Sequence, residues 1–175
     1  MTIKIKICGI TNIEDALNAS LLGADALGFV FVGKSPRYIT PLNTSIIIDA
    51  LPPFISKVGL FVNPSKEEVE DAIRVAKFDL LQFHGDENEE FCNQFNLPYI
   101  KAISVKSEVN LVEYETNYNS ASALLLDTYS EKARGGTGTT FDWNLIPAEE
   151  SKPLIIAGGL NNENITDLLR HTTPY

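Results

Sequence analysis

The sequence predicts an α/β fold, a TIM-type (βα)8 barrel of which this chain carries seven βα units. Strand-like and helix-like segments alternate seven times along the 175 residues, which is the pattern of a parallel sheet. The repeat is about 25 residues, the size of one βα unit. An open doubly wound sheet is the alternative. It usually has fewer strands, and its dinucleotide-binding form carries a G-x-G-x-x-G turn after the first strand, which is absent here.

The first unit places a cysteine where such folds carry their chemistry. Ile3, Ile5 and Ile7 alternate with lysines, which predicts a strand over residues 3–8. A capping box formed by residues 11 and 14 predicts a helix over about 12–22, and residue 23, a glycine, would end it. Cys8 therefore lies at the carboxyl end of a strand, just before a βα turn.

The other units follow in order, as one domain over residues 1–175. The predicted strands cover residues 26–32, 57–62, 80–84, 99–105, 123–127 and 154–157. The predicted helices cover residues 41–51, a segment that begins after a second capping box at 65–68, and segments within 87–95, 108–114, 142–146 and 163–170. The sequence stops after the seventh helix-like segment, so we expect a barrel truncated at its C-terminal end.

Composition excludes several classes of partner. The net charge of −9 argues against nucleic-acid and anionic-membrane binding. No run of about 18 apolar residues is present, and the N-terminus does not resemble a signal peptide. The two cysteines, Cys8 and Cys92, have no metal-ligand spacing. We therefore expect a cytoplasmic protein that binds no metal, membrane or nucleic acid.

Short motifs along the whole chain resemble those of the phosphoribosylanthranilate isomerases, the β/α barrels of tryptophan biosynthesis. Each motif is weak alone, but they occur in the family's order. They lie at residues 6–11, 23–25, 28–31, 35–37, 58–63, 81–85, 101–102, 126–127, 135–138 and 157–160. The resemblance implies an isomerase that converts N-(5-phosphoribosyl)anthranilate to 1-(2-carboxyphenylamino)-1-deoxyribulose 5-phosphate. The implied reaction is an Amadori rearrangement by general acid–base catalysis, and it needs no cofactor.

Two residues stand out as candidate catalytic groups. From the residues alone, Cys8 is more simply a small core residue, and Asp127, after four apolar residues, is a turn, cap or site residue. The resemblance implies that Cys8 is the general base and Asp127 the general acid. A helix N-terminus near Cys8 would favour the thiolate, and partial burial would keep Asp127 protonated enough to donate.

The resemblance also implies residues that bind the phosphorylated substrate. Arg37 would hold the anthranilate carboxylate, since its planar guanidinium suits a carboxylate. Glycines that let backbone N–H groups approach a phosphate would form the phosphate side. They are Gly135, Gly136, Gly158 and Gly159, with Arg134 as a lesser candidate. His84 is interpreted as a structural polar residue.

Two other interpretations stay open at this point. One is another phosphosugar barrel enzyme, either an indole-glycerol-phosphate synthase, with Lys101 as its acid, or a metal-dependent epimerase, which two histidines supply poorly. The other is a barrel fragment that is inactive or needs a partner. The family continues into an eighth unit with an Asp-x-Ser-Ser-Gly phosphate loop that this sequence lacks. We therefore expect open strand edges that permit self-association, and lower activity than in a chain with that unit.

Overall fold

The computed structural model describes residues 3–105, 111–128, 140–146 and 151–175. The chain forms two compact units, which divide between Tyr99 and Ile100. Both are built of parallel strands that alternate with helices. No helix within the described ranges is long and apolar enough to cross a membrane.

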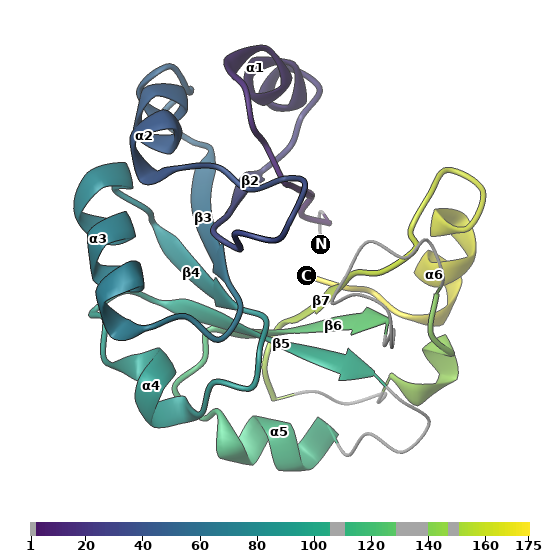
Figure 1. Cartoon of the computed structure of the whole chain (residues 1–175). Helices are drawn as coiled ribbons and strands as arrows, with labels where there is room; N and C mark the ends of the chain where they lie inside the picture. The colour runs from purple at the N-terminus through teal and green to yellow at the C-terminus, as the bar shows by residue number, and fades with distance from the viewer. Residues whose placement is uncertain (1–2, 106–110, 129–139, 147–150) are drawn as a thin grey trace. The chain divides into compact units, whose positions relative to one another are not determined.

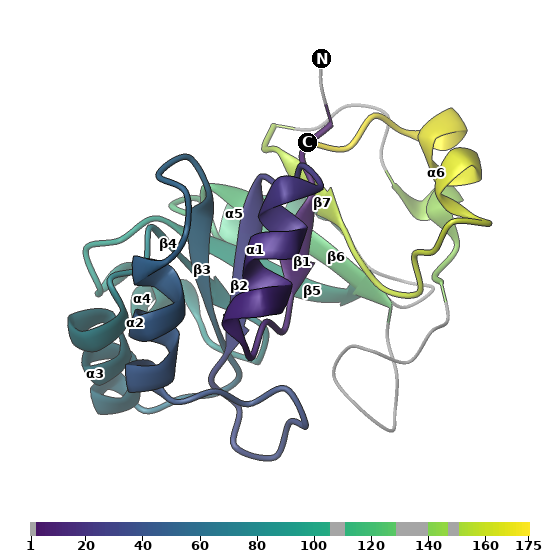
Figure 2. The same cartoon turned by 90° about the horizontal axis from the view of Figure 1, so that it is seen from above.

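The first unit contains four parallel strands in chain order. They are β1 (Lys6–Cys8), β2 (Ala26–Val30), β3 (Ser56–Phe61) and β4 (Leu80–Phe83). The helices between and after them are α1 (Ile13–Leu21), α2 (Pro41–Asp49), α3 (Lys66–Ala76) and α4 (Glu89–Asn93). Within this unit, α2, α3 and α4 follow one another along the same side of the strands (Figure 1), and Figure 2 shows the unit from above.

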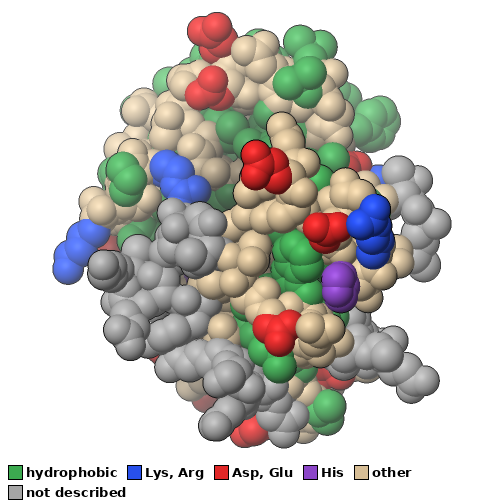
Figure 3. Space-filling view, turned by 90° about the vertical axis from the view of Figure 1, so that its right-hand side faces the viewer, with side chains coloured by type: hydrophobic (Ala, Val, Ile, Leu, Met, Phe, Trp, Pro, Cys, Tyr) green, Lys and Arg blue, Asp and Glu red, His purple; other side chains and the backbone are tan. Residues whose placement is uncertain are grey.

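The second unit contains β5 (Tyr99–Val105) except for its first residue, β6 (Ala123–Thr128) and β7 (Leu154–Ile156), again paired in parallel. Its helical segments are α5 (Leu111–Asn117), the short 3₁₀ helix η1 (Trp143–Leu145) and α6 (Ile165–His171). All of β6 is buried, as predicted for a strand covered on both faces. On the side that carries α6, hydrophobic side chains reach the surface between charged ones (Figure 3).

Helix α1 starts one residue later than its predicted capping box. The box at Thr11 and Glu14 is wrong, because Asn12 is the N-cap and its side-chain oxygen accepts from the N–H of Asp15 at 2.8 Å. The Asn12 amide also donates to the Asp15 carboxylate at 2.7 Å. Asparagine caps helices as well as threonine does, and here it forms two hydrogen bonds with one side chain.

The predicted capping box of α3 is confirmed. Ser65 accepts from the N–H of Glu68, and the Glu68 carboxylate accepts from the N–H of Ser65. The other two helices of the first unit also begin at residues whose side chains cap them, Thr40 for α2 and Asn88 for α4. Each of these helices therefore has its start fixed by a residue within its own βα turn.

Strand β1 is shorter than predicted, and the Asp25 carboxylate holds the backbone just before it. The Asp25 carboxylate accepts from the N–H of Ile5 and from the Lys4 ammonium, each at 2.9 Å. The Asp25 N–H in turn donates to the Ile5 carbonyl at 2.8 Å. Ile5 and Ile7 are 51% and 42% exposed, so the apolar side of this strand is not the covered one.

We predict that the hydrogen bonds of the Asp25 carboxylate to Lys4 and Ile5 stabilise the fold in a pH-dependent way. The Lys4 ammonium and the Ile5 N–H lower the pKa of Asp25, so its contribution is present above the ordinary value of about 4 and is lost as the pH falls through the lowered value. Asp25→Asn should lower the thermal midpoint at pH 7, and the difference from the unsubstituted chain should shrink at about pH 3. Asp71→Asn, at an exposed carboxylate on α3, is the control. An Asp25→Asn deficit that is equal at both pH values would contradict the prediction.

Candidate functional site

The thiol of Cys8 occupies space that a glycine leaves open. Cys8 ends β1 and pairs in register with Gly28 of β2. A Cβ built on Gly28 would lie 2.7 Å from Cys8 Sγ, which is closer than real Cβ contacts come. Position 28 must therefore be glycine if the half-buried thiol is to stay where it is.

The turn after Cys8 is fixed by the same neighbour. The N–H groups of Gly9 and Ile10 both donate to the Gly28 carbonyl, at 2.9 and 3.1 Å. Gly9 has a φ of +96°, a conformation that other residues rarely adopt. The turn leads directly into α1, so the thiol lies close in sequence to a helix start.

Arg37 lies beside Cys8. Its Nη1 donates to the carbonyl oxygen of Cys8 at 3.3 Å. Its side chain crosses Gly9 so closely that a Cβ there would meet Arg37 Cδ. The Ser35 hydroxyl accepts from the Arg37 N–H at 3.1 Å and shapes the loop. The guanidinium itself is exposed, so it can reach a ligand at the carboxyl ends of β1 and β2.

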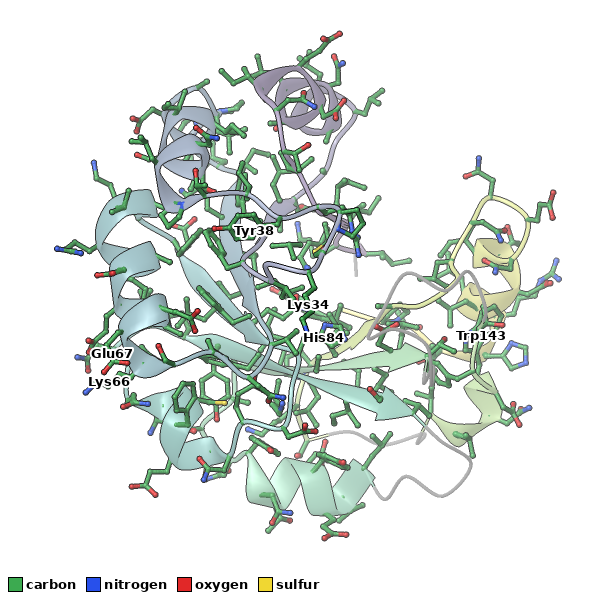
Figure 4. All side chains as sticks on the ribbon, viewed as in Figure 1. Lys34, Tyr38, Lys66, Glu67, His84 and Trp143 are labelled. Atoms are coloured by element: carbon green, nitrogen blue, oxygen red, sulfur yellow. The ribbon has the colours of Figure 1, made fainter. Side chains whose placement is uncertain are left out.

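Two polar side chains that the sequence analysis did not single out lie on the face that carries Cys8. Lys6 precedes Cys8 by two residues, and its Nζ donates to Oε1 of Gln82 at 2.8 Å. Gln82 Nε2 lies 3.0 Å from Nδ1 of His84. Figure 4 labels His84 where β4 ends, and Lys34 and Tyr38 on the loop after β2. In the sequence, the one signal that could have indicated Lys6 and Gln82 was a glutamine between apolar residues of a predicted strand.

Asp127 is the next-to-last residue of β6 and is almost fully buried, with 4% of its surface exposed. Its Oδ1 accepts from the N–H of Thr128 at 2.8 Å. Gly158 lies two residues after the end of the neighbouring β7, and a Cβ on it would lie 2.5 Å from Asp127 Oδ1 and would also meet Thr128 Oγ1. The predicted acid and one of the predicted phosphate-side glycines are therefore in contact.

The Gly158–Gly159 turn is ordered by asparagines. The two glycines have φ values of +86° and +65°. The Asn164 amide donates to the Gly159 carbonyl at 2.8 Å, and the Asn164 side-chain oxygen accepts from the N–H of Asn161 at 2.8 Å. Helix α6 begins only at Ile165, later than predicted, because these turns take up residues 161–164.

The remaining residues named from the sequence are Gly135, Gly136, Arg134 and Lys101. Gly135, Gly136 and Arg134 lie outside the described residues. Lys101 is buried in β5, with its Nζ 5.5 Å from the ring centroid of Tyr118. Ser104 pairs with Asp127 and is three residues from Lys101. The side chains of Ser104 and Lys101 therefore point to opposite faces of β5. Among the described residues, no three His, Cys, Asp or Glu side chains are close enough to hold a metal ion.

A thiol with a guanidinium at strand ends of one unit, and a buried carboxyl at a strand end of the other, are typical of β/α-barrel enzymes. The comparisons with known proteins give the particular family. Residues 5–175 match the family model of N-(5'-phosphoribosyl)anthranilate (PRA) isomerase. The N-(5'-phosphoribosyl)anthranilate isomerase of Nitrosospira multiformis is 50% identical over all of this chain and 84% of its own length. That of Pseudomonas fluorescens is 53% identical over 99% of this chain and 85% of its own length.

Solved structures agree. The phosphoribosylanthranilate isomerase of Thermotoga maritima is 40% identical and superposes with a TM-score of 0.88 over 99% of this chain and 85% of its own. A second isomerase structure, in complex with reduced 1-(o-carboxyphenylamino)-1-deoxyribulose 5-phosphate, gives a TM-score of 0.84 at 38% identity, over 99% of this chain and 84% of its own. The chain therefore belongs to the N-(5'-phosphoribosyl)anthranilate isomerase family. The predicted TIM-type fold with seven βα units and the predicted family are confirmed.

We predict that Gly28→Ala displaces the Cys8 thiol. The new Cβ would clash with Sγ, and an overpacked site of this kind costs about 1–3 kcal/mol of unfolding free energy. Denaturant unfolding would measure the loss. Gly33→Ala is the matched control, since nothing lies within 4 Å of a Cβ at Gly33. Equal stability of the two variants would contradict the packing argument.

Proposed function

We propose that this chain catalyses the Amadori rearrangement of N-(5-phosphoribosyl)anthranilate to 1-(2-carboxyphenylamino)-1-deoxyribulose 5-phosphate, a step of tryptophan biosynthesis in the cytoplasm. Membership of the isomerase family supports the reaction. The observation that carries the assignment of residues is the contact of Cys8, at the end of β1, with Gly28 of β2 and with Arg37 of the loop after β2. The reaction is an isomerisation, so each proton removed from the substrate is matched by one added.

Asp127 acts first, as the general acid. It protonates the furanose ring oxygen, the C1′–O bond breaks, and the anthranilate nitrogen supplies the electron pair that forms the Schiff base. Its position supports this role, because Asp127 lies near the carboxyl end of β6, where β/α-barrel enzymes carry their catalytic groups. The hydrogen bond from the Thr128 N–H to Oδ1 also holds the carboxyl group in one orientation.

Cys8 acts second, as the general base. Its thiolate removes the C2′ proton of the Schiff base, and the electrons flow to the nitrogen to give an enolamine, which tautomerises to the ketone. The half-buried position of Cys8 supports this role, because the thiol is within reach of a ligand while its backbone is fixed by Gly28.

Arg37 and the glycine turns bind the two charged ends of the substrate. The exposed Arg37 holds the anthranilate carboxylate, while backbone N–H groups at Gly158 and Gly159 bind the phosphate. Gly135 and Gly136, predicted for the same role, lie outside the described residues. The relative solved with a phosphorylated carboxyphenylamino ligand supports such binding. The Thermotoga maritima isomerase is named as dimeric, which supports self-association of this chain as well.

We predict that Cys8→Ala and Asp127→Asn each lower kcat/KM by about 10²–10⁴-fold, the usual contribution of a general base or acid. A fluorescence assay of isomerisation measures the effect. The matched controls are Cys92→Ala, at the other cysteine, and Asp71→Asn, on the surface of α3. Both should keep their activity per folded molecule.

Chain length is a second variable in this assay. Each substitution is therefore repeated in a chain extended at its C-terminus by an eighth βα unit, where the family resemblance predicts higher activity. If Cys8→Ala or Asp127→Asn keeps full activity in both lengths, the role given to that residue is wrong.

For Arg37 we predict a different kinetic pattern. Arg37→Lys keeps the charge but loses the planar pair of donors, so KM should rise by about tenfold, with a smaller change in kcat. Arg74→Lys on α3 is the control, since Arg74 is an exposed partner of Asp71. An unchanged KM in Arg37→Lys would show that Arg37 does not hold the carboxylate.

A further inference from the structure

Lys6 and Gln82 meet across the inner face of the first unit. They come from β1 and β4, with β2 and β3 between them. In a flat sheet, three strand spacings would separate them by roughly 14 Å, beyond the reach of two side chains. Their 2.8 Å hydrogen bond therefore places both on a concave face, the one that carries Cys8.

The chemistry of Lys6 fixes the orientation of the Gln82 amide. An ammonium group only donates hydrogen bonds, so the Gln82 oxygen must face Lys6. The NH₂ group of Gln82 then faces His84, and the ring nitrogen 3.0 Å away, Nδ1, must be the acceptor. A neutral imidazole that accepts at Nδ1 carries its proton on Nε2.

The backbone around His84 leaves little freedom except rotation of the ring. The His84 N–H donates to the Phe61 carbonyl at 2.8 Å. The buried Glu87 carboxylate accepts from the N–H of Gly85 at 2.9 Å and from that of Asn63 at 2.7 Å, which ties the loop after β4 to the loop after β3. Gln82 contacts the ring itself, at Nδ1.

We propose that Lys6 and Gln82 are positioning residues that lock His84 in its Nε2–H tautomer, so that the end of β4 presents an N–H donor rather than a lone pair. The benefit for catalysis rests on the proposed function. A phosphorylated, hydroxyl-rich carboxylate presents mainly oxygen acceptors, to which an N–H donor is complementary and a bare nitrogen is not.

The molecule contains its own reference histidine. The chain has two histidines, and the second, His171, has its Nδ1 2.8 Å from the carbonyl oxygen of Asp167. A carbonyl oxygen only accepts, so His171 carries its proton on Nδ1 when neutral. The two histidines are therefore expected to hold opposite tautomers in one sample.

The test is ¹⁵N NMR of the full chain labelled at histidine, at a pH where both rings are neutral. We expect a protonated Nε2 and a bare Nδ1 for His84, and the reverse for His171. Substitution at either histidine assigns the signals. A protonated Nδ1 in neutral His84 would overturn the proposal.

Gln82→Glu is the decisive variant, because it keeps the shape and the contact with Lys6 but replaces the amide donor by a carboxylate oxygen. A proton should then appear on His84 Nδ1, while His171 stays unchanged and reports an intact fold. Kcat/KM should fall by about three- to tenfold, the loss of one hydrogen bond to the substrate. An unchanged His84 tautomer overturns the lock, and a changed tautomer with unchanged kcat/KM overturns its role in the reaction.

Lys6→Met gives an independent check if Gln82→Glu does not fold. Without the ammonium, the Gln82 amide can turn over, so the His84 signals should show both tautomers. Persistence of the pure Nε2–H form would contradict the assignment to Lys6. The tautomer does not depend on turnover: an inactive chain with Nε2–H His84 refutes the proposed function alone, and an active chain with Nδ1–H His84 refutes this inference alone.

Discussion

The close approach of Gly28 to Cys8 is the constraint on which the candidate site of the first unit depends. The missing side chain makes room for the thiol, and the Gly28 carbonyl accepts from both Gly9 and Ile10, which turns the chain towards α1. Because Gly9 also lacks a side chain, Arg37 can cross the turn and donate to the Cys8 carbonyl. One backbone geometry thus places the thiol, the helix start and the guanidinium together.

In the second unit, too, a glycine makes room for a candidate catalytic side chain. Asp127 lies against Gly158, two residues after the end of β7, and a Cβ there would meet the carboxylate and the Thr128 hydroxyl. In both units the candidate catalytic side chain lies at or next to the end of a strand, and a glycine of the adjoining strand or of the turn that follows it lies against that side chain. Glycine here does not serve flexibility. It lets a neighbouring backbone come close enough to hold a reactive group still.

Local signals predicted most of the fold, and distant partners account for what they missed. The strand over 99–105 was predicted with the bounds that the structure has, and the capping box at Ser65 was found from two residues. Alternation predicted β1 but not that Lys6 faces inward, since its partner Gln82 lies 76 residues away. Likewise, Cys8 and Asp127 became candidate catalytic groups only through the family resemblance, because a thiol or an acid at a strand end has ordinary structural uses as well.

The charges in the first turns of the helices bear on how an anion meets this acidic chain. Helices α1, α3 and α4 carry two acidic residues each in their first turns, which offset the positive ends of their dipoles. Helix α2 has none, and Lys34 and Arg37 precede it on the same loop. A chain with a net charge of −9 therefore keeps a local positive potential near the end of β2. Such a potential favours the approach of an anionic ligand to that end of the strand, and added salt weakens this attraction.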